Sequence, residues 1–388
     1  GFNMVRKHLK VEPARWYYWT DKLGLLVWQD MPSPNSFLGR GQQAPPVDEE
    51  AFRRELSRMV ETHRNVPSII VWEIFNESQG RHDVENLVAL VRKLDPTRLI
   101  DEGGGGPSTG SGDVLDVHHY PAPICPPSSA TQALACGEYG GIGFRVPGHM
   151  WVDHGGGYTN VTSPEALVDL YAEFVGKLKV FRDEKGLSAA VYTQLTDVMT
   201  EINGLLTYDR VPKMDVRQIA RANRFEMPPP VYTVVAPTSE KEPQTWKYTT
   251  DTPRPNWYRK DFDDKAWKRG KGGFGTAGTP GTGLVETTWD TSDIWLRRIF
   301  HPGELTAGQI AKLMVRYYHD EDLEVYINGI LAYKIEGYMA GYENRPLTPA
   351  ARNAIKPSAD NVLAVHCRQT TGGQYVDVGL VIRERAKE

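Results

Sequence analysis

Residues 68–77, SIIVWEIFNE, place an amide and a carboxylate at the end of an apolar run. An apolar run of this length, with proline before it and Ser-Gln-Gly after it, is typical of a buried β-strand. Buried strands rarely carry acids unless the acids are used. In α/β architectures the chemistry is placed at the carboxyl ends of parallel strands. Asn76 and Glu77 are therefore the first candidates for a functional site.

The composition is that of an ordinary globular chain. Its 388 residues are 40% hydrophobic and 24% charged, enough for two or three domains at about 150 residues each. A formal charge of −4 provides no basic field for nucleic acid, and no segment approaches the roughly 18 apolar residues of a membrane span. We expect neither partner. Cys125, Cys136 and Cys367 are too few and too scattered for a disulfide framework or a metal site, so we expect free thiols, no metal and no cofactor.

The first part of the chain alternates apolar runs with amphipathic stretches. Strands are expected within residues 2–8, 25–32, 68–77, 98–103, 114–121, 135–141 and 187–198, and helices within 12–24, 48–65, 83–96 and 163–186. This alternation predicts a parallel sheet wrapped by helices. The predicted fold class is α/β, a (β/α)₈ TIM barrel that lacks its first strand, over residues 1–222.

The pattern changes after Ala222. A Pro-rich segment, 226–244, leads into short β-type runs at 294–300, 312–319 and 361–367. Asn328-Gly329 lies between two alternating apolar runs and indicates a type I′ hairpin. Residues 223–388 are therefore predicted to form an all-β domain, a β-sandwich of the jelly-roll kind.

A second carboxylate, Glu138, lies at the expected end of strand 135–141. If this strand and 68–77 are the seventh and fourth of a barrel, Glu77 and Glu138 project over the same mouth. Cleavage of a glycosidic bond needs two facing carboxyl groups, one protonated to assist the leaving oxygen and one ionised to attack or to activate water. Strand-end acids also cap helices, and the pattern alone leaves that alternative open.

Six segments together resemble the catalytic barrel of glycoside hydrolase family 2, in order and in spacing, over roughly residues 1–210. They are GFNMVRKH (1–8), LGLLVWQDMP (23–32), HRNVPSIIVWEIFNE (63–77), LDPTRLIDEG (94–103), HHYP (118–121) and GEYGG (137–141). That family contains β-galactosidases, β-glucuronidases and β-mannosidases. The resemblance implies a retaining mechanism with Glu77 as general acid/base and Glu138 as nucleophile, their carboxyl groups about 5 to 5.5 Å apart.

The resemblance also implies supporting roles. Asn76 would hydrogen-bond the sugar 2-hydroxyl, Arg6 would hold the nucleophile ionised, and Tyr120 would donate to it. The other strand-end candidates for contacts to sugar hydroxyls are His8, Asp30, His118 and His119, each with a purely structural role as the alternative. Glu73 shares the inward face of its strand with Glu77 and, lying deeper, is expected to be a paired structural acid.

Two departures from the family pattern stand out. The last barrel strand usually ends in a Trp four residues before an Asp, whereas here Thr193 precedes Asp197. Trp151, in the loop after the nucleophile, is the candidate replacement for this aromatic platform. The family's first barrel strand and its N-terminal domains are also missing from the pattern. We expect them elsewhere in the same polypeptide, because an open barrel exposes two strand edges.

The C-terminal segments FDDKAW (262–267), WLRRIF (295–300) and LEVYINGILAY (323–333) resemble the jelly-roll sugar-binding domain of family 2 enzymes, which implies a galactose-binding-like domain. Two functions stay open. The first is a retaining exo-β-glycosidase of β-galactosidase type, with β-glucuronidase or β-mannosidase specificity as variants. The second is a non-catalytic carbohydrate-binding or structural fragment. Either takes carbohydrate as its partner, and localisation stays open, with a secreted or periplasmic protein among the options.

Overall fold

The computed structural model describes residues 1–32, 47–228, 230–279, 284–337, 341–370 and 372–384. The chain divides into two compact units, Gly1–Pro229 and Pro230–Glu388. The division falls inside the Pro-rich segment, a few residues beyond the boundary that the sequence pattern indicates. No helix among the described residues combines the length and the apolar character needed to cross a bilayer.

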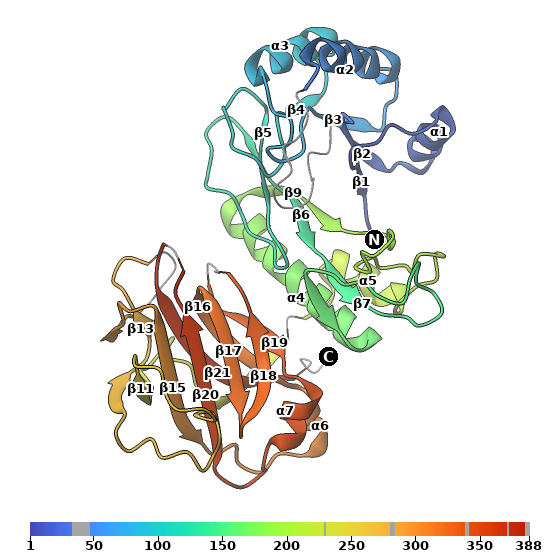
Figure 1. Cartoon of the computed structure of the whole chain (residues 1–388). Coiled ribbons are helices and arrows are strands. Elements are labelled where there is room, and N and C mark those ends of the chain that lie inside the picture. The colour runs from blue at the N-terminus through green and yellow to red at the C-terminus, as the bar shows by residue number, and fades with distance from the viewer. Residues whose placement is uncertain (33–46, 229, 280–283, 338–340, 371, 385–388) are drawn as a thin grey trace. The chain divides into compact units, whose positions relative to one another are not determined.

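Seven parallel strands form the frame of the first unit (Figure 1). Four make one sheet in the order β1–β2–β3–β4, and three make another in the order β5–β6–β9. Their bounds are β1 (Met4–Lys7), β2 (Leu26–Asp30), β3 (Ile69–Glu73), β4 (Leu99–Asp101), β5 (Val114–His118), β6 (Ala133–Gly140) and β9 (Leu187–Thr193). Asp113 joins the sheets, because its backbone N–H donates to the Ile100 carbonyl at 2.7 Å. All seven lie where the sequence predicts strands.

The strand order follows the chain, as in a TIM barrel, but the cylinder is not closed. Within the described residues β1 pairs only with β2, and β9 only with β6. The structure therefore has the seven predicted strands of the (β/α)₈ architecture, together with an open side between β9 and β1.

Alternation along these strands produces an apolar layer beneath a polar one. Trp28, Val71, Val114 and Ala135 pack together in one buried cluster, with Met4 against them. Side chains two positions further along a strand return to the same face. Two positions after the apolar residues of β1, β2, β3 and β5, the same face carries charged side chains. They are Arg6, Asp30, Glu73 and Asp116, in that order. The apolar layer thus supports a layer of charged groups at the carboxyl ends of the strands.

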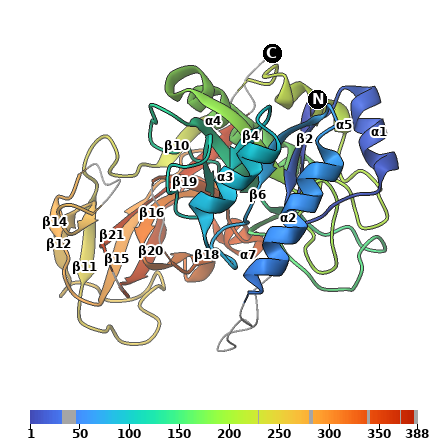
Figure 2. The same ribbon diagram turned by 90° about the horizontal axis from the view of Figure 1, so that it is seen from above.

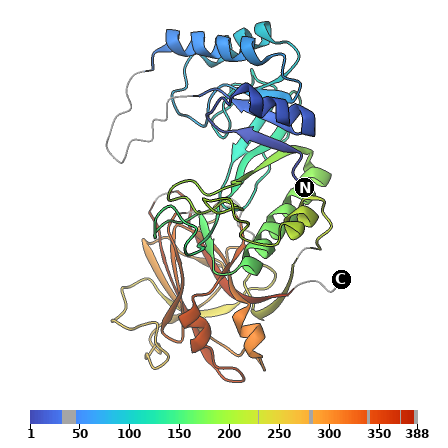
Figure 3. The same ribbon diagram turned by 90° about the vertical axis from the view of Figure 1, so that its right-hand side faces the viewer.

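Helices cover the outer side of the parallel strands. They are α1 (Ala14–Leu23), α2 (Glu49–His63), α3 (Val84–Leu94), α4 (Pro164–Val180), the π-helix η1 (Phe181–Lys185) and α5 (Val216–Asn223). Asp48 and Ser163 cap the first turns of α2 and α4 by accepting backbone N–H groups. Helices α2 and α3 lie side by side (Figure 2), as do α4 and α5, green and yellow-green in Figure 3. A small sheet of β7 (Ile142–Phe144) and β8 (Thr159–Val161), which the sequence pattern did not predict, follows β6.

The second unit is a β-sandwich of two six-stranded sheets. One has the order β14–β13–β21–β16–β19, with β10 beside β21, and the other has the order β12–β11–β15–β20–β17–β18. The strands are β10 (Val231–Ala236), β11 (Thr245–Thr249), β12 (Lys268–Lys271), β13 (Phe274–Gly275), β14 (Thr287–Thr288), β15 (Asp293–Phe300), β16 (Leu313–Asp320), β17 (Asp322–Ile327), β18 (Ile330–Ile335), β19 (Glu343–Pro346), β20 (Asn361–Arg368) and β21 (Tyr375–Glu384), and the short helices are α6 (Ala307–Ala311) and α7 (Pro349–Ala354).

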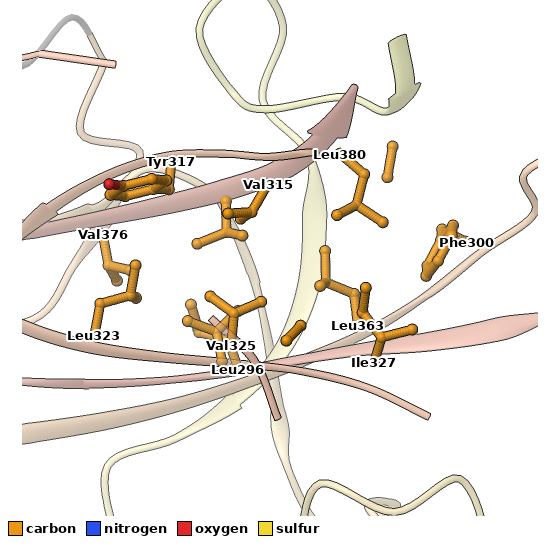
Figure 4. Packing of buried hydrophobic residues seen from close by; sticks show 14 of the residues in the cluster. Leu296, Phe300, Val315, Tyr317, Leu323, Val325, Ile327, Leu363, Val376 and Leu380 are labelled. Atoms are coloured by element: carbon orange, nitrogen blue, oxygen red, sulfur yellow. The ribbon is translucent and has the colours of Figure 1, made fainter. Parts of the chain in front are cut away.

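The sandwich core lies between the two sheets. Leu323 and Leu363 from one sheet face Val315, Val376 and Leu380 from the other (Figure 4). All five side chains are fully buried.

Two smaller sequence predictions also concern local structure. Asn328 and Gly329 join β17 to β18 with φ angles of 50° and 90°, the positive values that a type I′ turn requires, so the predicted hairpin is confirmed. Cys125, Cys136 and Cys367 are free thiols, as expected.

Truncation of a core leucine should destabilise the sandwich far more than truncation of an exposed one. Leu323→Ala removes a fully buried side chain and should lower the free energy of unfolding by about 2–5 kcal/mol. Leu331→Ala, in the next strand at 39% exposure, is the matched control and should cost less than about 1 kcal/mol. Urea unfolding of both variants measures the difference, and equal losses would contradict the packing described here.

Candidate active site

Strand register brings the charged side chains to one end of the parallel sheets. Asp30 lies beside Glu73 in the β2–β3 ladder, and Glu73 lies beside Asp101 in the β3–β4 ladder. In the other sheet, His118 on β5 lies beside Glu138 on β6. These positions are at the carboxyl ends of the strands, where barrel enzymes place their active sites.

Arg6 connects this layer. Its guanidinium makes two hydrogen bonds to Asp30, at 3.1 and 3.0 Å, and one to Glu73 at 2.5 Å. It also donates to Glu138 Oε1 at 2.9 Å and to Asn76 Oδ1 at 2.8 Å. Burial opposes its charge, but the three carboxylates raise the pKa of Arg6 well above its usual value. Arg6 is therefore a permanent, buried cation that orients four side chains at once.

Two of the acids around Arg6 are buried and paired with it. Asp30 is 1% exposed, and its oxygens accept from Arg6 and from the Leu9 backbone N–H at 3.1 Å. The sequence predicts Asp30 as a candidate for sugar contact with a structural role as the alternative; the structure pairs it with Arg6, and the sugar contact stays a prediction. Glu73 is fully buried and paired with Arg6, as predicted for a structural acid. Burial and the neighbouring acids raise the pKa of Glu73 well above its usual range despite Arg6.

Glu138 is held in its charged form. Arg6 donates to Oε1 at 2.9 Å, and the Tyr120 hydroxyl donates to Oε2 at 2.6 Å. Burial would raise the pKa of Glu138, but the charges of Arg6 and His118 and the Tyr120 hydrogen bond lower it below the usual value. His8 Nε2 lies 3.8 Å from Oε1. Glu138 is therefore an ionised carboxylate with both oxygens fixed.

Glu77 has a different environment. Its side chain is 43% exposed, and its backbone N–H donates to the Gly104 carbonyl at 2.7 Å. Its φ of 57° lies in the left-handed region, which is uncommon for a residue other than glycine and often marks a functional position. One oxygen of Glu77, one oxygen of Glu138 and a ring nitrogen of His118 all lie within 4.8 Å of one another. The two carboxylates thus face each other.

His118 lies between the two glutamates. Its Nδ1 is 3.4 Å from Glu77 and 3.5 Å from Glu138, and its Nε2 is 3.3 Å from Asp116 Oδ2. Burial disfavours the charged ring, but Asp116, Glu77 and Glu138 together raise the pKa of His118 to about 9. Glu77, His118 and Glu138 are close enough to ligate a metal ion. Arg6 Nη1 lies 3.2 Å from His118 Nε2, and the charge of Arg6 opposes the rise in the pKa of His118.

The glycine run at 103–106 is part of the site, although the sequence alone assigned it no role. A Cβ on Gly104 would lie 2.7 Å from oxygens of both Glu73 and Asp116. Gly105 has a φ of 70° and lies directly against the His118 ring. A side chain on Gly104 would displace the carboxylates, and one on Gly105 would displace His118, which explains glycine at these two positions of the loop after β4.

Tyr158 is a site residue that the sequence interpretation missed. Its ring stacks on Tyr120, with centroids 3.7 Å apart and an interplanar angle of 6°, while 59% of the residue stays exposed. Burial raises its pKa, and the charges of Glu201, Glu138 and Glu77 add to the effect. Tyr120 donates to Glu138, so the ring stacked on it borders the site. The available signal was the aromatic residue that ends the loop GHMWVDHGGGY, seven residues after Trp151.

Of the remaining predicted residues, Trp151 and His119 contact local partners, whereas His8 lies beside Glu138. Trp151 packs on Tyr208 at 5.0 Å, and the His119 ring lies 2.7 Å from the Ala122 carbonyl, so both have local partners instead of the glutamates. His8 has a side chain 55% exposed beside Glu138, open to a substrate. Thr193, which stands where the family has its Trp, lies 2.8 Å from the Tyr120 hydroxyl.

Comparisons with known proteins identify the barrel segment. Residues 1–119 match the family model described as glycosyl hydrolases family 2, TIM barrel domain. Over 117 residues the chain is 31% identical to a β-galactosidase of Klebsiella pneumoniae, covering 30% of this chain and 11% of that protein. Over 257 residues it is 27% identical to β-galactosidase 2 of Enterobacter cloacae, covering 58% and 24%. A putative β-glucuronidase of Formosa agariphila is 32% identical over 112 residues, covering 28% and 10%.

Solved structures resemble the chain only at low identity. A β-glucuronidase 2 of Bacteroides uniformis aligns with 99% of this chain and 61% of its own, at 11% identity and a TM-score of 0.41. A β-D-glucuronidase of Dictyoglomus thermophilum aligns with 58% and 45%, at 17% identity and 0.43. The sequence matches place residues 1–119 among the glycoside hydrolases. Residues 1–119 are thus similar to the family 2 barrel domain, and the chain spans about a tenth to a quarter of the length of the curated relatives named above.

Removal of the Arg6 charge should destabilise the first unit strongly. Arg6→Gln leaves Asp30, Glu73 and Glu138 without their common cation, and uncompensated buried charge costs about 3–5 kcal/mol. Arg54→Gln is the matched control, because Arg54 forms an exposed pair with Glu50 at 3.7 Å, worth at most about 1 kcal/mol. Urea unfolding measures both, and an Arg6→Gln loss no larger than the control would contradict the role of Arg6.

The raised pKa of His118 predicts a pH dependence of stability. A histidine whose pKa rises from 6.5 to about 9 on folding contributes stability that is fully present below pH 6.5 and is lost as the pH rises through 9. The contribution is on the order of 3 kcal/mol. The free energy of unfolding, measured with urea at pH 6 and at pH 9.5, should fall between the two pH values in the unaltered chain. It should fall less in His118→Gln. An identical pH dependence in the two proteins would refute it.

Proposed function

We propose that the chain is a retaining β-glycosidase in which Glu138 is the nucleophile and Glu77 the general acid/base. The supporting observation is the approach of the two carboxylates, whose nearest oxygens lie within 4.8 Å. Carboxyl groups about 5–5.5 Å apart are typical of retaining enzymes, whereas inverting enzymes need about 6.5–9.5 Å to admit a water molecule.

The different environments of the two acids support this division of roles. Glu138, fixed by Arg6 and Tyr120, attacks the anomeric carbon while Glu77 gives its proton to the departing glycosidic oxygen. The bond to the leaving group breaks as the bond to a Glu138 oxygen forms. Glu77, now a carboxylate, then takes a proton from water, and that water releases the sugar from Glu138 with its anomeric configuration retained.

Neighbouring residues contribute to binding in this proposal. Asn76 Oδ1 is occupied by Arg6, which leaves the Nδ2 group of the amide as the donor for a sugar hydroxyl. His118 places positive charge between the two acids. Tyr158, half-exposed and stacked on Tyr120, replaces the missing Trp as the aromatic surface for the sugar ring.

For the substrate we propose a β-galactoside as the first to test. Relatives carry the names β-galactosidase and putative β-glucuronidase, so β-glucuronides and β-mannosides belong in the same panel. We further propose that the second unit is a galactose-binding-like jelly roll.

A second candidate is a non-catalytic carbohydrate-binding fragment. It is favoured by the open side of the barrel, where β1 and β9 each pair with one strand among the described residues. We propose that a further strand of the same polypeptide closes this gap. The two candidates separate on a panel of aryl β-glycosides with Glu138→Ala as the inactive control.

Substitution of each glutamate should give a distinct kinetic result. Glu77→Ala should slow substrates with poor leaving groups far more than activated aryl glycosides, because only the former need protonation, and azide should restore turnover as a β-glycosyl azide. Glu138→Ala should abolish turnover of both, by about 10³-fold or more, because no covalent intermediate can form. Activity of Glu138→Ala on activated substrates, with none from Glu77→Ala, would reverse the assignment.

The aromatic platform can be located by a pair of substitutions. Tyr158→Leu should raise KM about fivefold or more, since an aromatic contact to a ring contributes roughly 1 kcal/mol or more. Trp151→Leu removes a similarly exposed aromatic residue that packs on Tyr208 and should change KM less than about twofold. Steady-state kinetics with the best aryl glycoside measures both, and the opposite ranking would restore Trp151 as the platform.

A further inference from the structure

The sandwich sheet opens between two of its strands. β11 and β15 form a ladder that ends at the pair Lys247 and Arg297. Before this pair, residues 245–246 of β11 pair with β12 and not with β15. After it, residues 298–300 of β15 pair with β20 and not with β11. Among the described residues no ladder joins β11 to β15 past this point, and side chains of both strands line a cavity there.

A cavity of about 380 Å³ lies at this opening, entirely within the second unit. Five of its lining side chains are basic and two are acidic; the basic ones are Lys247, Lys260, Arg269, Arg297 and Arg298. The chain as a whole carries a formal charge of −4. Positive charge is therefore concentrated here against the overall balance.

Only part of this positive charge is neutralised. Lys247 and Arg297 share one carboxylate, that of Asp264, at 2.6 and 2.9 Å. Lys260 donates to the backbone carbonyl of Asp360 at 2.9 Å, while the Asp360 carboxylate pairs with a histidine instead.

Arg269 and Arg298, like Lys260, have no carboxylate partner among the described residues. Arg269 is exposed on β12, and no carboxylate partner exists for it among the described residues. Arg298 donates to the carbonyls of Pro237 and Val378, at 2.7 and 3.1 Å, without a carboxylate in hydrogen-bond range in the same described ranges.

Arg298 is the most constrained of these cations. Its guanidinium lies over the Trp246 ring, 4.4 Å from the centroid, and its buried Nε has no acceptor among the described residues. Burial lowers the pKa of Arg298 to about 10, only partly offset by Asp377. A desolvated cation with incomplete hydrogen bonding gains from an anion placed beside it.

We propose that this cavity binds an anionic sugar residue, one that carries a carboxylate or a sulfate group. Its volume is within the range of small-molecule sites, about 300–1,000 Å³. Lys260, Arg269 and Arg298 contact the anionic group, and Phe262 and Trp246 provide the apolar wall. The preference for an anion depends on the cavity alone. The choice of a sugar as its carrier rests on the proposed function of the chain.

The test is calorimetric titration of the full chain carrying Glu138→Ala, so that no probe is cleaved. The probes are oligogalacturonate, a sulfated galactan oligomer, a neutral galactan oligomer, inorganic sulfate and single-stranded DNA. One of the two anionic oligosaccharides should bind at least about tenfold more tightly than the neutral oligomer, and its affinity should fall with rising salt. Comparison of the carboxylated and sulfated probes identifies the anionic group.

Substitutions locate the binding. Lys260→Gln with Arg269→Gln should weaken binding of the anionic oligosaccharide at least about tenfold, whereas Lys268→Gln, which removes the same charge from the neighbouring position of β12 outside the cavity, should change it less than about twofold. Equal binding of the neutral oligomer, unchanged binding by the double variant, or equal affinity for sulfate alone or for DNA would overturn the inference. In the chain with Glu138 intact, Lys260→Gln with Arg269→Gln should retain hydrolysis, so a failure here is distinct from a failure of the catalytic proposal.

Discussion

One buried guanidinium organises the carboxyl ends of the parallel strands. Arg6, from the first strand in the chain, bonds acids on β2, β3 and β6 and the amide that precedes Glu77. Each of these groups alone would be costly to bury, and together they form a network in which the cation is shared. The network fixes Glu138, and it also ties the β1–β4 sheet to the β5–β9 sheet across the open barrel.

The two candidate catalytic acids differ because their surroundings differ. Glu138 is fixed at both oxygens by Arg6 and Tyr120, whereas Glu77 is nearly half exposed and contacts His118. A retaining mechanism needs this asymmetry, since one group must be ionised while the other carries a proton. Thr193 stands where the family pattern has a Trp at the end of the last strand. Its hydroxyl hydrogen-bonds Tyr120, and the ring of Tyr158 stacks on the other side chain of this pair, Tyr120.

Much of the first unit could be predicted from the sequence, because its strands are long apolar runs between helical patterns. The positions of Arg6, Glu77, Glu138 and Tyr120 follow from strand ends and from the family resemblance. What could not be predicted depends on three-dimensional register. The pairing of Glu73 could be predicted from its inward position deeper in the strand, whereas the contact of Asp30 with the same guanidinium could not. The glycine run at 103–106 has no pattern that reveals which side chains approach it.

The central claim, that Glu138 is the nucleophile of a retaining mechanism, is tested most directly by trapping the intermediate. A 2-deoxy-2-fluoro-β-galactosyl fluoride slows release of the sugar from the enzyme, and peptide mapping by mass spectrometry then locates the label. One label per chain is expected on the peptide that contains Glu138, and no label after Glu138→Ala. A label on Glu77, or turnover with inversion of the anomeric configuration, would contradict it.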